Sequence, residues 1–96
     1  MTSKQRAYLR GLANNIDAIF QIGKNGINDN LIKQLNDALE ARELIKITVL
    51  ETAPDSAKDL SFEIAERTDS IVIQVIGNKI NLFRQRKKDS KINLPS

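Results

Sequence analysis

The chain has 96 residues, of which 41% are hydrophobic and 28% charged, enough for one small folded domain and too few for two. No apolar run approaches the roughly 20 residues that a membrane-spanning helix needs, and the polar, basic start argues against a secretory signal. We therefore expect a cytoplasmic protein without membrane association.

Cysteine and histidine are absent, which excludes disulfides, thiolate chemistry and nucleophiles activated by histidine. We expect no metal, no cofactor, no small-molecule substrate and no enzymatic activity.

The charged side chains are unevenly distributed along the chain. Residues 1–33 carry five basic and two acidic side chains, residues 34–70 carry four and nine, and residues 71–96 carry six and one. If folding gathers the two basic ends on one side, the protein presents a positive face that attracts polyanions. The alternative is that the fold scatters these charges over a solvated surface.

Hydrophobic periodicity and capping residues predict three helices that alternate with strands. The helices are expected to start at Ser3, at Asn28 or Asp29, and at Ser56. Their apolar stripes continue as far as Ile16, Leu39 and Ala65. Strands are predicted over residues 18–22, 44–50, 71–76 and 79–84.

Two expectations concern burial. The strand 71–76 is almost continuously apolar, which predicts that both of its faces are buried. Phe20 and Phe62 lie in apolar surroundings in the sequence, and we expect both rings in the core.

The element order is αβαβαββ. The stretches from residue 22 to 44 and from residue 50 to 71 are long enough for helical crossovers between parallel strands, and Gly77-Asn78 predicts a hairpin to a final antiparallel strand. These features predict a single compact, monomeric α/β domain over residues 1–84, with a four-stranded mixed sheet covered by helices. Residues 85–96 are charged and lack periodicity, which predicts a flexible basic tail.

Gly23-Lys24-Asn25-Gly26 lies between a predicted strand and a predicted helix. Free backbone N–H groups and the helix dipole favour an anion there, and glycine at both ends lets the backbone turn sharply and approach a phosphate. Lys24 would supply charge and Asn25 hydrogen bonds. KH-type modules clamp a nucleic-acid backbone with a loop of this spacing, although their order of elements differs. A tight turn that only needs two flexible residues is the alternative.

Further basic side chains come from separate segments of the chain: Lys4, Arg6, Arg10, Lys79 and Arg84. They extend a phosphate-binding surface only if the fold brings them together, and the alternative is an ordinary solvated surface. Aromatic residues make up 4% of the chain, so few rings are available for bases to stack on. We therefore expect the protein to recognise the shape and the backbone of a nucleic acid, and not stacked bases.

Five segments between residues 3 and 84 carry a resemblance to a known family: Lys4-Gln5-Arg6-x-x-Leu9-Arg10, Ile22-Gly23-Lys24-Asn25-Gly26-Ile27, Glu43-Leu44-Ile45-Lys46-Ile47, Gln74-Val75-Ile76-Gly77 and Leu82-Phe83-Arg84. In this order and spacing they resemble the CRM domain family (chloroplast RNA splicing and ribosome maturation), in its single-domain, bacterial YhbY-like form. The resemblance implies a fold similar to the C-terminal domain of bacterial translation initiation factor three.

The resemblance also implies RNA binding and, for the stand-alone bacterial members, association with large-subunit ribosomal precursors. Carried over by position, the RNA-binding residues are Gly23, Lys24, Asn25 and Gly26 of the loop, Lys4, Arg6 and Arg10 of the first helix, and Arg84 of the last strand. We therefore expect a non-enzymatic protein that binds ribosomal RNA during large-subunit assembly.

A protein-interaction module is the alternative, in which the acidic residues 34–70 dock ribosomal proteins or assembly factors. The salt dependence of RNA affinity separates the two. The logarithm of the affinity of an RNA binder falls with the logarithm of the salt concentration, with a slope of about −0.7 per phosphate contacted on a single strand.

Overall fold

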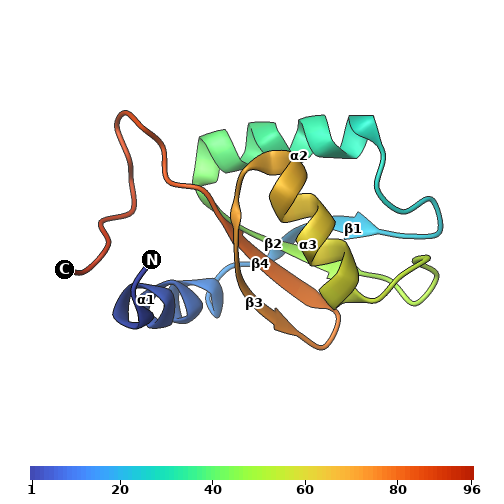
Figure 1. Ribbon diagram of the computed structural model, residues 1–96, viewed down its shortest axis with the longest axis horizontal. Helices are drawn as coiled ribbons and strands as arrows, with labels where there is room; N and C mark the ends of the chain where they lie inside the picture. The colour runs from blue at the N-terminus through green and yellow to red at the C-terminus, as the bar shows by residue number, and fades with distance from the viewer.

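The computed structural model describes residues 1–96 and has three helices and one four-stranded sheet (Figure 1). The predicted order αβαβαββ and the mixed sheet are confirmed. The elements are α1 (Ser3–Ala13), β1 (Ala18–Ile22), α2 (Asp29–Arg42), β2 (Leu44–Val49), α3 (Ala57–Thr68), β3 (Ile71–Ile76) and β4 (Lys79–Phe83). None of the helices combines the length and the apolarity that a membrane crossing requires.

The helix starts follow from short polar side chains that accept backbone N–H groups. Asn28 caps α2 by accepting from Leu31 N at 2.8 Å, and Ser56 caps α3 by accepting from Asp59 N at 3.2 Å. Helix α1 is capped by Thr2 and not by the expected Ser3. A reciprocal capping box with Gln5 explains the difference, because each residue satisfies the backbone N–H of the other.

The strand order is β1-β2-β4-β3. Strand β1 runs parallel to β2, and β4 runs antiparallel to both of its neighbours. The last strand is therefore inserted into the middle of the sheet, and β3 is left at an edge. The prediction that residues 71–76 are buried on both faces is wrong, since Ile71 is 39% exposed and Ile76 54% exposed.

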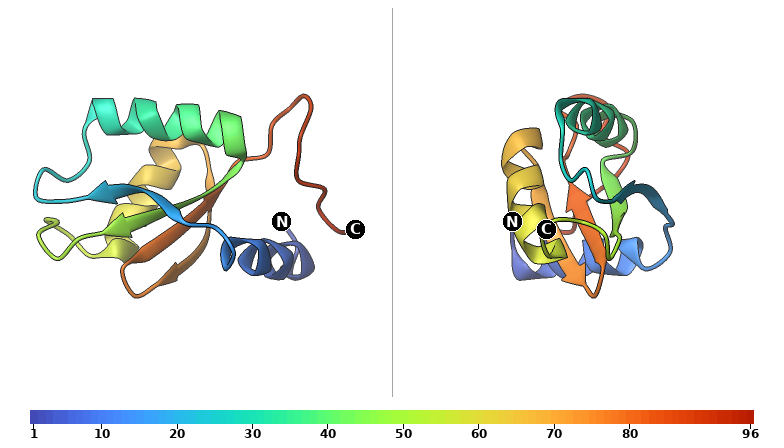
Figure 2. Two further views of the ribbon diagram at one scale, coloured as in Figure 1. Left: turned by 180° about the vertical axis from the view of Figure 1, so that it is seen from behind. Right: turned by 90° about the vertical axis from the view of Figure 1, so that its right-hand side faces the viewer.

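The core forms on both faces of the sheet. On one face, α2 and α3 pack over a cluster of twelve buried residues that includes Leu35, Ile64 and Ile45. Neighbouring strand residues point to opposite faces, so Leu44 and Phe83 belong to a second cluster with Leu9 and Ala13 of α1. Helix α1 therefore covers only one end of the other face (Figure 2).

The two phenylalanines that we expected in the core differ in how deeply they are buried. Phe20 of β1 is partly buried against the larger cluster. Phe62 is 60% exposed, so its predicted place in the core is wrong. The apolar stripe that α3 presents to the sheet consists of Ala57, Leu60 and Ile64, and Phe62 falls outside this i, i+3, i+7 spacing.

Residues 85–96, the predicted flexible tail, form neither helix nor strand, yet they contact the body of the domain. The Glu43 carboxylate accepts from the backbone N–H groups of Arg86 at 2.8 Å and Lys91 at 2.6 Å. Ile92 and Leu94 pack against the smaller apolar cluster. Sequence patterns gave no sign of these contacts, because residue 43 and the tail are more than forty positions apart.

Candidate nucleic-acid interface

The glycine loop forms a tight turn between β1 and α2. The N–H of Gly26 donates to the carbonyl of Gly23 at 3.0 Å. Gly26 has a φ of +61°, and a Cβ atom there would lie 3.0 Å from Cγ of Pro54, so this position strongly favours glycine. A Cβ at Gly23 would lie 3.6 Å from the Thr52 hydroxyl, an ordinary contact. The steric need for glycine is therefore confined to Gly26.

Beside this turn lies a polar depression of about 400 Å³. Lys24 and Asn25 are exposed at its rim, and Asn28 places the start of α2 in its wall. Its lining contains one cation and no carboxylate: Gln21, Gly23, Lys24, Asn25, Gly26, Asn28, Asn30, Leu31 and Gln34. Amide side chains, a lysine and a helix N-terminus together suit a phosphate group.

The acidic residue nearest to this depression in sequence is paired. Asp29 is the first residue of α2, and its Oδ1 accepts from Nη2 of Arg67 at 2.6 Å. Arg67 lies near the end of α3, so the ion pair joins the two helices. Although an exposed pair adds little stability, its cation offsets a negative charge that would otherwise lie unpaired beside the loop.

The basic residues of α1 have different environments. Lys4 is exposed and Arg10 is partly buried. Nη1 of Arg6 donates to the carbonyls of Val72 at 2.7 Å and Ile73 at 3.2 Å, where the register of β3 shifts against β4. Arg6 therefore satisfies backbone acceptors in an irregular part of the sheet, a structural task that sequence patterns did not indicate.

Arg84 is also engaged within the fold. Its Nη1 donates to Oδ1 of Asn36 at 2.7 Å and to the carbonyl of Thr68 at 2.6 Å, and its Nη2 donates to the carbonyl of Asn36 at 3.0 Å. The carboxylate of Glu40 lies 3.5 Å away. The guanidinium thus links α2 to the carboxyl end of α3, where a cation is favoured.

The structure separates the predicted site residues into two groups. Gly23, Lys24, Asn25 and Gly26 lie together after the end of β1. Because Leu44 at the start of β2 pairs with Phe83 at the end of β4, Arg84 lies at the opposite end of the sheet. Helix α1, with Lys4, Arg6 and Arg10, packs near that same end, so the loop and α1 lie far apart along the molecule (Figure 1).

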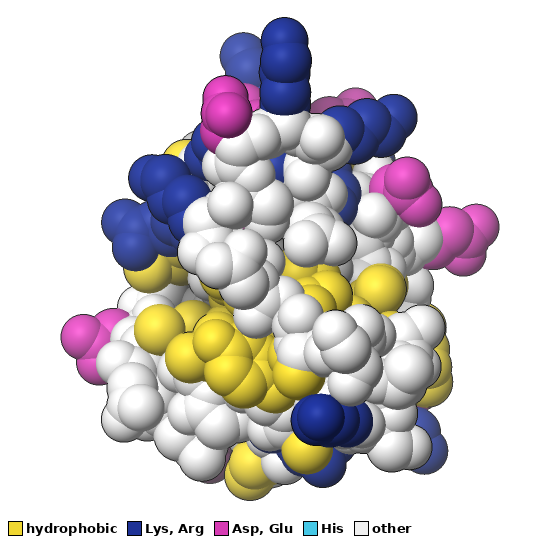
Figure 3. Space-filling model, turned by 90° about the vertical axis from the view of Figure 1, so that its left-hand side faces the viewer, with side chains coloured by type: hydrophobic (Ala, Val, Ile, Leu, Met, Phe, Trp, Pro, Cys, Tyr) yellow, Lys and Arg dark blue, Asp and Glu magenta, His cyan; other side chains and the backbone are white.

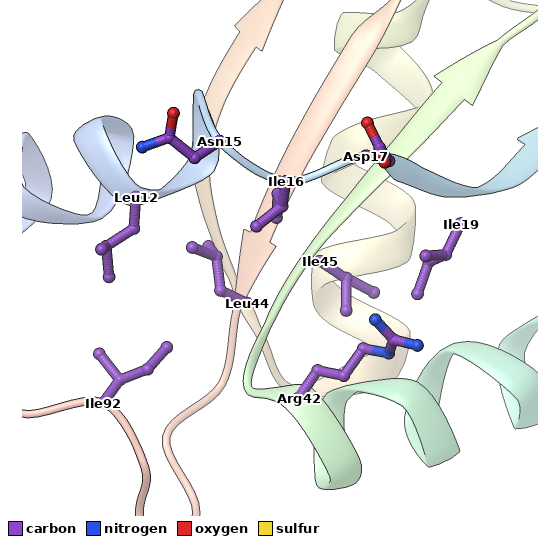
Figure 4. Close-up of a pocket in the computed structure, with 9 residues that line it drawn as sticks. All are labelled: Leu12, Asn15, Ile16, Asp17, Ile19, Arg42, Leu44, Ile45 and Ile92. Carbon is purple, nitrogen blue, oxygen red and sulfur yellow. The ribbon is translucent and has the colours of Figure 1, made fainter.

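An apolar depression of about 600 Å³ lies at the end that carries α1 (Figures 3 and 4). Leu12 of α1, Ile16 just after it, Leu44 of β2 and Ile92 of the tail face it, with the Arg42 guanidinium at its edge (Figure 4). It contains no cluster of acidic residues that could bind a metal. It is distinct from the polar depression beside the loop.

Comparison with known proteins places this architecture in a family. The model of the CRS1/YhbY (CRM) domain matches residues 1–84. The chain belongs to the CRM domain family. It is 43% identical over 95 residues, covering 99% of both chains, to YqeI of Bacillus subtilis, which is named a probable RNA-binding protein. It is 28% identical to an RNA-binding protein of Haemophilus influenzae over 99% of this chain and 95% of the relative.

A solved structure shows the same fold. The solution structure of SAV1595 from Staphylococcus aureus superposes on this CRM domain with a TM-score of 0.82 at 53% sequence identity, and the match covers 99% of each chain. The four-stranded mixed sheet with three helices is therefore an arrangement that this CRM domain shares with a solved structure.

Proposed function

We propose that this protein binds RNA and that the loop Gly23–Gly26 holds a phosphate of the RNA backbone. The observation that carries the proposal is the carboxylate-free depression beside the loop, in which Lys24 is the single charged side chain. The ammonium group of Lys24 and the amide side chains of Asn25 and Asn28 would donate to phosphate oxygens, and the dipole of α2 favours the negative charge. Relatives named as RNA-binding proteins support the same function.

The RNA we propose is ribosomal, in precursors of the large subunit assembling in the cytoplasm. Support comes from the resemblance to single-domain bacterial members described above and from the absence of an aromatic platform for reading bases. Of the four aromatic side chains, Phe83 is buried and Phe20 is packed against the core. The exposed Tyr8 and Phe62 lie apart, on α1 and α3, which pack against opposite faces of the sheet. Contacts to backbone and shape suit a partner with extensive folded structure.

The test is the affinity of the protein for a labelled transcript of large-subunit ribosomal RNA, measured over a range of salt concentrations. Lys24→Ala should weaken binding roughly fivefold, the equivalent of about 1 kcal/mol, and make the salt slope shallower by about 0.7 if the phosphate lies on a single strand or about 0.9 if it lies on a double helix. Lys58→Ala is the matched control, because Lys58 is an exposed lysine on α3 that does not line the depression beside the loop. Equal affinities of the two variants would contradict a role for the loop.

Sedimentation of a cell lysate tests the ribosomal part. The protein should migrate with large-subunit precursors at low salt and leave them at high salt or on Lys24→Ala substitution. If the isolated protein binds no RNA but still migrates with these particles, docking to a protein through the acidic residues 34–70 is the better description.

A further inference from the structure

We propose that the face of the sheet opposite α2 and α3 is a second contact surface for the RNA backbone, continuous with the glycine loop. This inference rests on the proposed function and extends it from one phosphate to a path across the molecule. Figure 2 (left) looks onto this face, which is covered at one end by α1 and is otherwise free of helices. The side chains of the rest of this face, hereafter the open face, are those of Gln21, Lys46, Thr48, Gln74, Ile76, Lys79 and Asn81, of which Thr48 and Asn81 are buried among their neighbours.

The charge of the open face is purely positive. Lys46 and Lys79 are the only charged residues in the four strands, and the strands contain no carboxylate. Both lysines belong to the open face, because they alternate along β2 and β4 with Ile45, Ile47 and Ile80 of the main core. Although the exposed Ile76 at the end of β3 is apolar, the face carries two cations and no anion, which makes it complementary to a polyanion.

Lys79 is held in position for such an interaction. Its Nζ donates to the hydroxyl of Thr48, its cross-strand partner, at 2.7 Å. An ammonium group has three donors, so two remain for phosphate oxygens. Part of the side-chain ordering that binding would require is already present in the free protein.

Asn81 supplies an unmet hydrogen-bond acceptor. It is only 3% exposed, and its Oδ1 has no hydrogen-bond partner. In the register of the sheet it lies between Lys46 of β2 and Gln74 of β3. These neighbours have long, flexible side chains, which must move aside on binding so that the 2′-hydroxyl of a ribose donates to this oxygen.

The open face connects the two groups of predicted site residues. Gln21 lines the depression beside the loop and also pairs with Thr48 in the register of β1 and β2. Thr48 pairs with Lys79 of β4. Two residues further along each strand, in the direction of α1, Lys46 pairs with Asn81 on the same face. No aromatic side chain lies on the open face, so the ligand class is a sugar–phosphate backbone, without stacked bases.

Substitution of the two lysines tests the proposal. The probe is a labelled single-stranded RNA oligonucleotide, with affinity measured at several salt concentrations. Lys46→Gln combined with Lys79→Gln should weaken binding roughly tenfold and reduce the salt slope by about 1.4, that is, by about 0.7 for each phosphate that the protein no longer neutralises. The matched control Lys58→Gln, on α3, should leave affinity and slope unchanged.

The outcomes separate this inference from the proposed function. If Lys24→Ala weakens binding but the double lysine variant matches Lys58→Gln, the open face is not a contact surface, although the loop still is. If the wild-type protein binds no RNA, both proposals fail. If polyglutamate displaces the RNA as effectively as unlabelled RNA does, the face is a general polyanion surface and the assignment to RNA is wrong.

Asn81→Leu gives an independent readout. The substitution removes a buried acceptor without a partner, so the melting temperature should stay the same or rise. If Asn81 accepts from the RNA, the affinity should fall several-fold in the same variant. An unchanged affinity would remove Asn81 from the RNA-binding surface.

Discussion

The carboxylate of Glu43 and the hydroxyl of Ser90 lie 2.7 Å apart, forty-seven positions apart in the sequence. Glu43 ends α2 with a φ of +67°, a conformation that costs energy for any residue other than glycine, and it is fully buried. A buried carboxylate persists only when its oxygens accept hydrogen bonds, and all those observed here come from the tail: Arg86 N, Ser90 Oγ, Lys91 N and Ile92 N. Glu43 and the tail therefore depend on each other.

Replacing Glu43 with glutamine should release the tail. The amide would direct a donor at backbone N–H groups that are themselves donors, so the variant should lose about 1–3 kcal/mol of unfolding free energy. Urea unfolding measures this loss, and faster tryptic cleavage after Arg86, Lys87, Lys88 and Lys91 reports release of the tail. Glu66→Gln, at an exposed position on α3, is the control. Equal cleavage rates in both variants would show that Glu43 does not hold the tail.

The same interaction predicts a dependence of stability on pH. Burial acts to raise the pKa of the Glu43 carboxyl, but the hydrogen bonds from Ser90, Arg86, Lys91 and Ile92 together outweigh it and hold the pKa below its ordinary value of 4.5. Because the folded-state pKa is the lower one, the contribution of Glu43 is fully present above the unfolded pKa and is lost as the pH falls through the folded value. The difference in unfolding free energy between wild type and Glu43→Gln should therefore be constant at neutral pH and shrink as the pH falls below the ordinary value of 4.5. A difference that is the same at pH 7 and pH 3 would contradict this account.

The two loop glycines should differ in their tolerance of a side chain. Gly26→Ala places a Cβ 3.0 Å from Pro54 at a positive φ, and should cost about 1–2 kcal/mol. Gly23→Ala makes only an ordinary contact with Thr52 and should change stability by less than about 1 kcal/mol. Thermal unfolding compares the two variants. Equal destabilisation would mean that the turn relaxes around residue 26. For this reason Lys24→Ala is a cleaner test of RNA binding than any substitution at Gly26.

Local sequence signals predicted the parts of this structure that depend on near neighbours. Caps at Asn28 and Ser56, and the glycine loop after β1, involve residues within three or four positions of each other. The order of the strands in the sheet, by contrast, could not be predicted from near neighbours. The apolarity of residues 71–76 fits a central strand as well as an edge strand, and the periodicity of β3 does not encode that β4 would pair between it and β2.

Long-range contacts also set the roles of basic side chains. Arg6 contacts residues 66 and 67 positions away, and Arg84 contacts Asn36, 48 positions away. A sequence pattern shows only that these side chains are basic. It cannot show that they satisfy carbonyl groups of the fold, so their assignment to RNA in the sequence stays a prediction.

Arg84→Lys should therefore act mainly on stability. The guanidinium donates to two groups of Asn36 and to the carbonyl of Thr68 at once, and an ammonium group cannot reproduce that planar geometry. The ion pair with Glu40 adds little because the Glu40 side chain is exposed. We expect a loss of about 1–3 kcal/mol in unfolding free energy, measured by urea unfolding. The affinity for RNA should change less than in Lys24→Ala when both are measured well below the unfolding midpoint. The opposite pattern, with stability kept and RNA binding abolished, would place Arg84 in the RNA interface, as its position in the CRM family motif implies.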